Sequence, residues 1–279
     1  MEEKAMGKGP GGGHMRPPLV KETTASPIGD DIYCIVSPPV GFYQYLILGQ
    51  EKALLVDTGM GIGSIRKVVE SITSLPVIVV NTHCHPDHAG GNAEFDPALC
   101  NPADLDVFRT MATKEFRIQD VSHMPGDVDW AAQLQPTGPE PVPAEDGQII
   151  DLGGRQVQII FTPGHTHGSL CVFEEATGTL FTGDNVQGRT TTVREWNSCP
   201  VEVLYESLKK LQALPLKRML AGHMPNDNSP EILDWEILCA GEILAGAKDE
   251  PRDFRGQTVY EHRYNGIGIE YAEGNIRKQ

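Results

Sequence analysis

The chain has 279 residues, 39% of them hydrophobic, which suits one large domain or two small ones with a buried core. Its 38 acidic and 23 basic residues give a formal net charge of −15 without a sizeable Lys/Arg cluster, which argues against a nucleic-acid partner. No apolar run approaches the roughly 20 residues that a membrane-spanning helix needs, so no membrane association is expected.

The chain begins with MEEKAMGKGPGGGHM, which lacks the apolar run of a secretory signal peptide. Its glycine-rich composition predicts that residues 1–14 are a tail introduced by cloning and that residues 15–279 form one domain. The six cysteines show no CxxC pair, which is typical of reduced, buried thiols. These features predict a cytoplasmic protein.

The first half of the domain predicts three strands, a helix and a fourth strand. Residues 32–37, 43–49 and 52–59 are short apolar segments bounded by Pro and Gly, which is typical of strands. Apolar residues at helical spacing predict a helix over 62–75. The continuous apolar run at 76–83 predicts a strand that is buried on both faces.

Residues 102–146 are the least regular part of the sequence. The stretch PADLDVFRTMA at 102–112 favours a helix, but four prolines follow between positions 136 and 143. We predict an irregular insertion here that forms a lid or a wall of a functional site.

The second half predicts further strands and two amphipathic helices. The helices are expected over 199–215 and 229–246, the second with Ser229 as its N-cap and Pro230 at its first position. Strands in two groups with interleaved helices predict an α/β protein with two mixed sheets packed face to face and helices outside. The expected strands of this half are 148–154, 155–164, 169–175, 178–184, 217–223 and 259–271.

The motif NTHCHPDHAGGN at 81–92 places four metal-type ligands within six positions, directly after a predicted strand. Zinc accepts imidazole nitrogen and carboxylate oxygen, and catalytic sites keep one position open for water. His83 and His85 alternate, so in an extended loop they point the same way. Asp87 and His88 lie on the turn beyond, where they can meet a second ion. The alternative is an ordinary polar loop that water satisfies.

Three later residues strengthen the metal interpretation. His165 in TPGHTHGS, Asp184 in LFTGD and His223 in LAGH each follow a predicted strand, and each has a neighbouring glycine that permits a tight turn. One such strand end is a weak signal. Four of them in one chain predict a metal site.

With these motifs in order, the sequence resembles the hydrolases of the metallo-β-lactamase superfamily. DTG, THCHPDH and three Gly-His or Gly-Asp pairs match the five motifs of that family over roughly residues 30–225. The resemblance implies a four-layer αβ/βα sandwich with a dinuclear metal site at one edge of the two sheets. It implies His83, His85 and His165 on one ion, Asp87, His88 and His223 on the other, Asp184 bridging both, and Asp57 orienting a ligand or a water molecule.

The same resemblance implies hydrolysis of a carbonyl compound by a hydroxide shared between two divalent ions, with Asp87 and Asp184 as catalytic residues. We expect zinc, with iron and manganese as alternatives. The bridging Asp184 favours hydroxyacylglutathione hydrolase-like and lactonase-like members over true β-lactamases. The expected substrate is a small-molecule ester, thioester, lactone or related amide. No basic cluster follows His223 to grip the carboxylates of glutathione.

Other functions of the superfamily remain alternatives at this stage. One is a persulfide dioxygenase-like enzyme with a single iron, and another is a phosphodiesterase or nuclease, which the net charge disfavours. Seven intact ligands disfavour a non-catalytic binding module, and self-association is left open. We expect substrate contacts from Phe42, Tyr43, His167 and Arg189, with packing or surface roles as the alternative for each.

Overall fold

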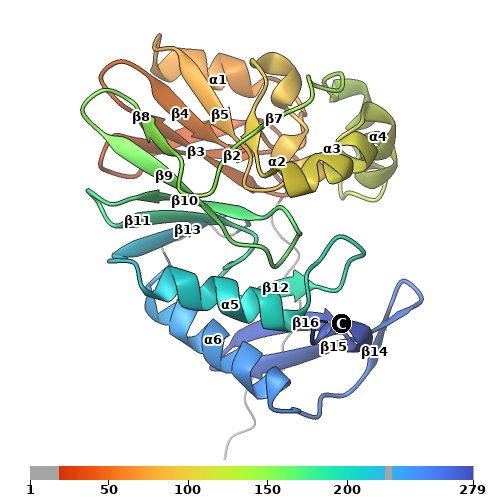
Figure 1. Ribbon diagram of the computed structural model, residues 1–279. Coiled ribbons are helices and arrows are strands. Elements are labelled where there is room, and N and C mark those ends of the chain that lie inside the picture. Colours follow the sequence, from red (N-terminus) through yellow and green to blue (C-terminus); the bar gives the residue numbers. More distant parts are fainter. Residues whose placement is uncertain (1–18, 224–227, 279) are drawn as a thin grey trace, which may run out of the picture.

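The computed structural model describes residues 19–223 and 228–278, so the expected tail at 1–14 lies outside the described residues. Two sheets pack face to face and carry helices on their outer faces, as the sequence predicts (Figure 1). A third, smaller sheet lies beyond the lower helix layer and was not predicted.

The first sheet has the strand order β1 to β7. Its first four strands are antiparallel hairpin neighbours, whereas β4 to β7 run parallel to one another. All four side chains of β4 are buried, because this strand is covered on both faces. The strands are β1 (Thr24–Pro27), β2 (Ile32–Ser37), β3 (Phe42–Leu48), β4 (Ala53–Val56), β5 (Val77–Val80), β6 (Leu99–Cys100) and β7 (Val142–Pro143).

The second sheet has the order β13-β11-β10-β9-β8. Because β10 runs antiparallel to both neighbours and β13 runs parallel to β11, the carboxyl ends of β9, β11 and β13 meet at one edge. Apolar side chains from both sheets fill the space between them, among them Ile32, Leu54, Ile159 and Phe181. The strands are β8 (Ile149–Asp151), β9 (Gln156–Phe161), β10 (Leu170–Glu174), β11 (Thr179–Gly183) and β13 (Arg218–Ala221).

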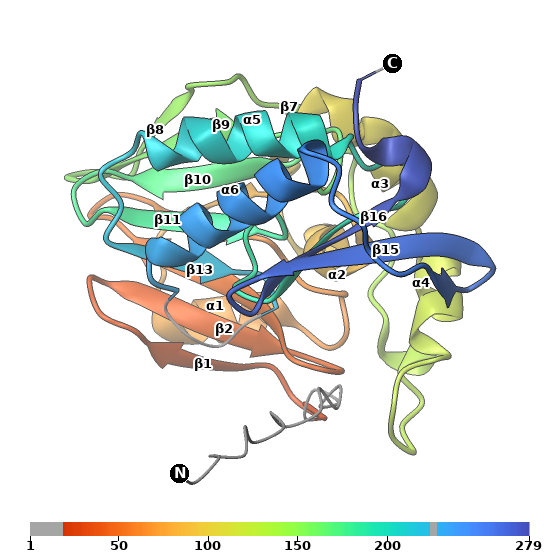
Figure 2. The ribbon, with the colours of Figure 1, turned by 90° about the horizontal axis from the view of Figure 1, so that it is seen from below.

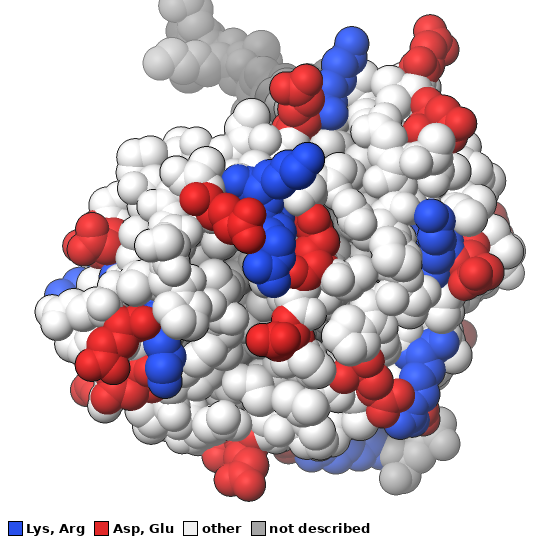
Figure 3. Space-filling model, turned by 90° about the horizontal axis from the view of Figure 1, so that it is seen from above, with Lys and Arg blue, Asp and Glu red and all other residues white. Residues whose placement is uncertain are grey.

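Helix α1 (Ile65–Ile72) covers the first sheet and packs Ile65 and Val69 against it. It is shorter than predicted, because the Ser64 hydroxyl caps its N-terminus and the backbone is extended at Thr73. On the face seen in Figure 3, on the α1 side of the molecule, Lys and Arg side chains lie among Asp and Glu side chains. This face therefore offers no continuous basic surface of the kind that nucleic acid requires.

Helices α5 (Val201–Gln212) and α6 (Glu231–Leu244) cover the second sheet (Figure 1). Helix α6 begins one residue later than predicted, with Pro230 in place of Ser229 as its N-cap. Within 19–223 and 228–278, no helix is both long enough and apolar enough to cross a membrane. All six cysteines are buried.

The segment 102–146 is more ordered than its sequence suggested. It contains helices α3 (Leu105–Met111) and α4 (Lys114–Val121), and Thr113 caps the second of them. The helical pattern of α4 was missed because Arg117 occupies an inward-facing position. Its guanidinium is buried and donates hydrogen bonds to four carbonyl groups, those of Met60, Ala112, Gln135 and Pro136. The remaining short helices are α2 (Pro86–Ala89), η1 (Asn92–Glu94), η2 (Pro102–Asp104), η3 (Ala131–Gln133) and η4 (Glu273–Asn275).

The third sheet has the order β12-β16-β15-β14 and packs against α6 (Figure 2). The single strand predicted over 259–271 is wrong, because two strands form a hairpin there. Asn265 and Gly266 form its turn with φ of 48° and 87°, values typical of an Asn-Gly hairpin turn. The strands are β12 (Thr190–Val193), β14 (Arg252–Phe254), β15 (Gln257–Tyr264) and β16 (Ile267–Ala272).

Glu236 of α6 is fully buried, and neither of its carboxylate oxygens has a hydrogen-bond partner. Burial raises the pKa of Glu236 to about 8, and the neighbouring Thr191 side chain offsets only part of this. In the folded protein Glu236 keeps its proton up to about pH 8, whereas in the unfolded chain it loses that proton above pH 4.5. The free energy of unfolding therefore falls as the pH rises from 4.5 to about 8. We expect Glu236→Gln to raise the melting temperature at the upper end of this window and to leave it unchanged at the lower end.

The measurement is a series of thermal melts across this pH range. Glu231→Gln, an exposed change on the same helix, is the matched control and should show no such pH trend. A constant difference between wild type and Glu236→Gln at every pH would contradict the prediction.

Candidate metal centre

Four loops at the adjoining edges of the two large sheets bring the predicted ligands together. The loop after β5 carries His83 and His85, and the short helix α2 that follows carries Asp87 and His88. His165, Asp184 and His223 come directly or soon after β9, β11 and β13, whose carboxyl ends share one edge. A Cβ atom at Gly222 would lie 2.6 Å from the His88 ring and 2.8 Å from Asp184, so only glycine permits this close approach.

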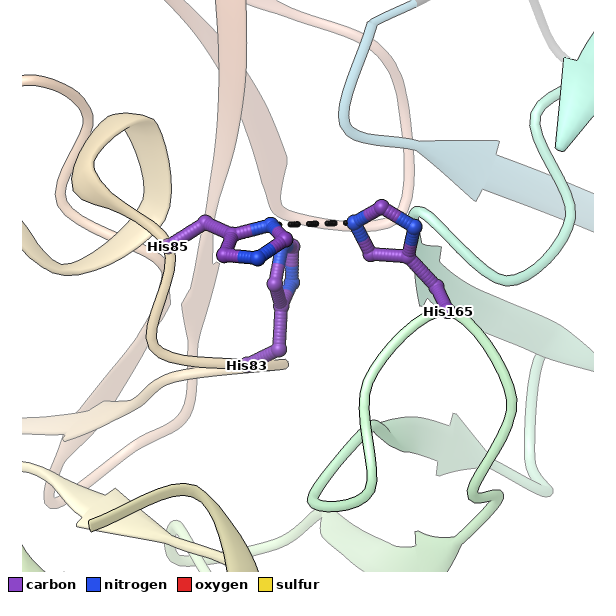
Figure 4. Close-up of side chains that lie close together, drawn as sticks. All are labelled: His83, His85 and His165. Carbon is purple, nitrogen blue, oxygen red and sulfur yellow. Dashed lines mark hydrogen bonds between the residues drawn. The ribbon is translucent and has the colours of Figure 1, made fainter. Parts of the chain in front are cut away.

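Three histidines converge on one point from two sheets (Figure 4). The His85 Nδ1 atom lies 3.0 Å from His83 Nε2 and 3.0 Å from His165 Nε2. Burial and neighbouring histidines hold the pKa of His83 well below its ordinary value, and burial and His165 lower the pKa of His85 to about 3. Both imidazoles are therefore neutral at pH 7, which is the form that binds a metal ion.

The second group of ligands combines histidines with carboxylates. His223 Nε2 lies 3.2 Å from Asp87 Oδ2 and 3.1 Å from Asp184 Oδ2, and His88 Nε2 lies 3.3 Å from Asp184 Oδ1. Burial alone would raise the pKa of Asp184, but His223 and His88 outweigh it and hold that pKa well below its ordinary value. Burial lowers the pKa of His223, yet Asp184 and Asp87 raise it to about 9 overall. A cation that binds His223 must therefore displace its proton.

Two buried atoms test whether these residues suit a metal ion. His88 Nε2 and Asp184 Oδ1 lie 3.3 Å apart, but neither forms a hydrogen bond, although buried polar atoms normally do. Among the described residues, three sets of ligand atoms each lie within 4.8 Å of one another. They are His83–His85–His165, His83–His88–Asp184 and Asp87–His88–His223. A divalent cation would satisfy the unpaired atoms, so the residues fit a metal-binding site with nitrogen and carboxylate ligands.

Asp57 holds the second group in place. Its Oδ2 atom lies 2.7 Å from His88 Nδ1, and its two oxygens accept hydrogen bonds from the Thr82 amide and hydroxyl. A carboxylate on the far nitrogen fixes the orientation of a ligating histidine. This is the place that the family resemblance gave to Asp57. Its backbone has a φ of 63°, an uncommon value outside glycine.

Two further orienting contacts were missed by the sequence reasoning. The His165 Nδ1–H group donates to the Thr192 carbonyl at 2.7 Å. The Asn197 amide lies 2.8 Å from His85 Nε2, and its oxygen is buried without a partner. With the amide turned so that this oxygen faces the ring, His85 Nε2–H donates to it and Nδ1 stays free for a metal ion. A backbone carbonyl and an asparagine in an irregular loop leave no sequence signal.

Asp104 was also missed. It is fully buried at the start of α3 and joins the two loops that carry the three-histidine group. Its carboxylate accepts hydrogen bonds from the Cys84 and Gly168 amides and from the Thr166 hydroxyl, at 2.9, 2.8 and 2.9 Å. Cys84 packs in a small apolar core beneath the loop.

The four expected substrate contacts lie in different places. Phe42 is buried in an apolar cluster and meets the His223 ring edge-on, with 5.5 Å between centroids. Tyr43 is partly buried against the core between the two sheets. His167 is exposed, and its amide donates to Asn197. Arg189 lines a cavity that also contains Asp184 and His223.

A second cavity, of about 480 Å³, opens on the other side of the ligands. Its walls come from the ligand loops, from α3 and α4, and from the loop after β12. The helices of the 102–146 segment therefore form one wall, as proposed from the sequence. The apolar side chains of this wall and rim are Met111, Phe116 and Trp196.

Comparison with known proteins identifies relatives in sequence and in structure. Acyl-coenzyme A thioesterase MBLAC2 of Homo sapiens is 30% identical over 190 residues, which cover 57% of this chain and 64% of the relative. Atrochrysone carboxyl ACP thioesterase of Aspergillus fumigatus is 27% identical over 205 residues, covering 71% of this chain and 41% of the relative. The chain thus spans less than two thirds of these curated relatives.

Among solved structures, a metallo-beta-lactamase family protein from Thermus thermophilus aligns with a TM-score of 0.60 and 20% identity. The alignment covers 80% of this chain and 84% of that protein, and it supports the fold. The family model for the metallo-beta-lactamase superfamily matches residues 43–223, which include every predicted ligand. The chain therefore belongs to the metallo-beta-lactamase superfamily.

Proposed function

We propose that the protein is a metal-dependent hydrolase that cleaves small-molecule thioesters at a centre of two divalent ions. The position of Asp184 carries this proposal. Its two carboxylate oxygens face opposite ligands, His88 through Oδ1 and His223 through Oδ2, and it lies 3.7 Å from His165 of the three-histidine group. A carboxylate in this position can serve two ions at once.

We assign the ligands to two ions as the family resemblance implies. His83, His85 and His165 would hold one ion, Asp87, His88 and His223 the other, and Asp184 both. Zinc suits this set of ligands, and iron or manganese would also be accepted. When bound, such ions act as Lewis acids on a carbonyl and make water a nucleophile near neutral pH.

The residues of the chain orient the reaction and move its proton. In hydrolysis, water adds to the carbonyl carbon, the C–S bond breaks, and the products are a carboxylic acid and a thiol. Asp87 is positioned to pass a proton from water to the departing sulfur, and Asp184 sits opposite it across His223. Asp57 keeps the His88 ring aimed at the centre during these steps.

The relatives and the cavity favour a thioester among the carbonyl substrates. Both curated relatives described above are named thioesterases, one for acyl-coenzyme A and one for an acyl carrier protein. The cavity walled by Met111, Phe116 and Trp196 suits an apolar acyl group. The proposed reaction is the thioester hydrolysis expected of the hydroxyacylglutathione hydrolase-like members of the superfamily. The thiol that carries the acyl group would not be glutathione.

The test is a substrate panel with metal analysis of the purified protein. We expect about two zinc-like ions per chain and a kcat/KM for an acyl-coenzyme A thioester at least about 10-fold above those for a lactone, an aryl ester and a β-lactam. A chelator should remove the activity, and added zinc should restore it. Activity confined to bis-phosphodiesters, or one iron without zinc together with persulfide oxidation, would overturn the proposal.

A further inference from the structure

A cavity of about 540 Å³ lies beside Asp184 and His223, between the metal centre and the third sheet. We call it the arginine groove, because four arginines line it. Two of them flank β12, one lies on β14 and one lies on β15. The four are Arg189, Arg194, Arg252 and Arg263.

The charge of the arginine groove is opposite to that of the whole chain. Four arginines face two glutamates, apart from the metal ligand Asp184, in a chain of net charge −15. Buried Glu270 contacts both Arg194 and Arg252, and Glu261 contacts Arg263 at 2.6 Å. Arg194 also pairs with Glu195 at 3.3 Å, so four arginines stand against three glutamates in all. Arg189 has an exposed side chain and forms no ion pair with any residue of 19–223 or 228–278. The groove therefore holds positive charge in excess, which an anion would balance.

The arginine groove and the cavity beside Met111, Phe116 and Trp196 meet at the metal centre. Asp184, Thr192 and Arg194 line both of them. A substrate whose reacting carbonyl lies at Asp184 can thus extend in two directions. One side offers the apolar side chains of Met111, Phe116 and Trp196, and the other offers four guanidinium groups. The two halves of a thioester with an apolar acyl group and an anionic thiol match this division.

We propose that the arginine groove binds the phosphate groups of the leaving thiol, so that the substrate is a thioester of phosphorylated pantetheine. This inference rests on the proposed function and deepens it. Guanidinium groups bind phosphate in bidentate geometry. Coenzyme A and the prosthetic arm of an acyl carrier protein share this chemistry, and the acyl group then lies beside Met111, Phe116 and Trp196.

Arg189 and Arg263 are the residues to change. Both side chains are exposed, whereas loss of Arg194 or Arg252 would leave Glu270 buried with one partner fewer. The experiment measures hydrolysis of hexanoyl-coenzyme A, hexanoyl-phosphopantetheine and hexanoyl-pantetheine, which differ in their phosphate groups. It also measures binding of free coenzyme A and free pantetheine by calorimetry.

We expect Arg189→Gln and Arg263→Gln each to raise KM for hexanoyl-coenzyme A about 10-fold, with kcat and the hydrolysis of hexanoyl-pantetheine unchanged. Arg189→Lys should recover part of the loss. Arg277→Gln, which removes an exposed arginine paired with Glu202, is the matched control and should behave as wild type. If the variants also raise KM for hexanoyl-phosphopantetheine, the groove recognises the phosphate that coenzyme A shares with the arm of a carrier protein. If KM rises only for hexanoyl-coenzyme A, the groove recognises the phosphates that coenzyme A alone carries.

Binding separates this inference from the proposed function. Wild-type protein should bind free coenzyme A at least about 10-fold more tightly than pantetheine, and both variants should lose that preference. Equal binding of the two thiols, or equal losses on phosphorylated and neutral thioesters, would overturn the role of the arginine groove. Failure to hydrolyse any thioester while this binding preference persists would overturn the proposed function alone.

Discussion

Replacement of Asp184 by asparagine is expected to lower hydrolysis by at least about 100-fold. The change keeps the shape of the side chain and removes the negative charge that lies within 3.3 Å of His88 Nε2 and 3.1 Å of His223 Nε2. An amide offers one oxygen, whereas the two ions proposed above would each need one. Metal content should therefore fall together with kcat, and both are measured on the same preparation.

Asp146→Asn is the matched control for this change. Asp146 pairs with Lys210 on the surface, at 2.9 Å, and lies outside the two cavities that flank the centre. It should leave metal content and turnover as in wild type. Full turnover of Asp184→Asn with full metal content would show that Asp184 does not serve two ions.

The second large effect is expected for Asp104→Ala, on stability and on metal affinity together. The change leaves the amides of Cys84 and Gly168 and the hydroxyl of Thr166 without their buried acceptor. Each unsatisfied buried donor costs about 1–3 kcal/mol, so the loss in unfolding free energy should reach about 3 kcal/mol or more. Because the two loops that carry His83, His85 and His165 lose their link, metal affinity should fall about 10-fold or more.

Urea unfolding measures the first effect, and competition with a metal-binding dye measures the second. Asp106→Ala, two residues along the same helix and exposed, is the matched control and should change neither quantity. Asp104→Asn keeps one acceptor oxygen and should fall between wild type and alanine. Identical urea midpoints for wild type and Asp104→Ala would refute the linking role.

The residues that converge at the candidate metal centre could be predicted from sequence, because each follows a strand and has a strong chemical signature. His165 and His223 each follow a glycine, and His83 to His88 form one dense motif. Apart from Asp57, the residues that orient them carry no such signature. Thr192 acts through its backbone carbonyl, and Asn197 lies in a loop without periodicity. Such contacts depend on tertiary structure and leave no local pattern in the chain.

The elements of the fold also differ in how well the sequence predicts them. The longer strands of the two large sheets were predictable, because they are apolar runs bounded by glycine and proline. Strands β1, β6 and β7 were not predicted, because β1 is polar and exposed and the other two have only two residues each. Helix α4 was missed because a buried arginine took the place of an apolar residue and is satisfied by carbonyl groups instead. The hairpin of β15 and β16 did have a signal, the dipeptide Asn265–Gly266, which was not used.

The distribution of the ligands along the chain has a consequence for the order of events in folding. His83 and His223 are separated by more than half of the chain, and neither large sheet carries the whole set of donor atoms. Sheet-to-sheet contacts at this edge, such as Leu170 N–H to the Thr82 carbonyl and Tyr45 Oη–H to the Ala221 carbonyl, must form before the donors converge. Docking of the two halves therefore precedes capture of any ion that needs donors from both, and refolding should proceed at the same rate whether the ion is present from the start or supplied afterwards.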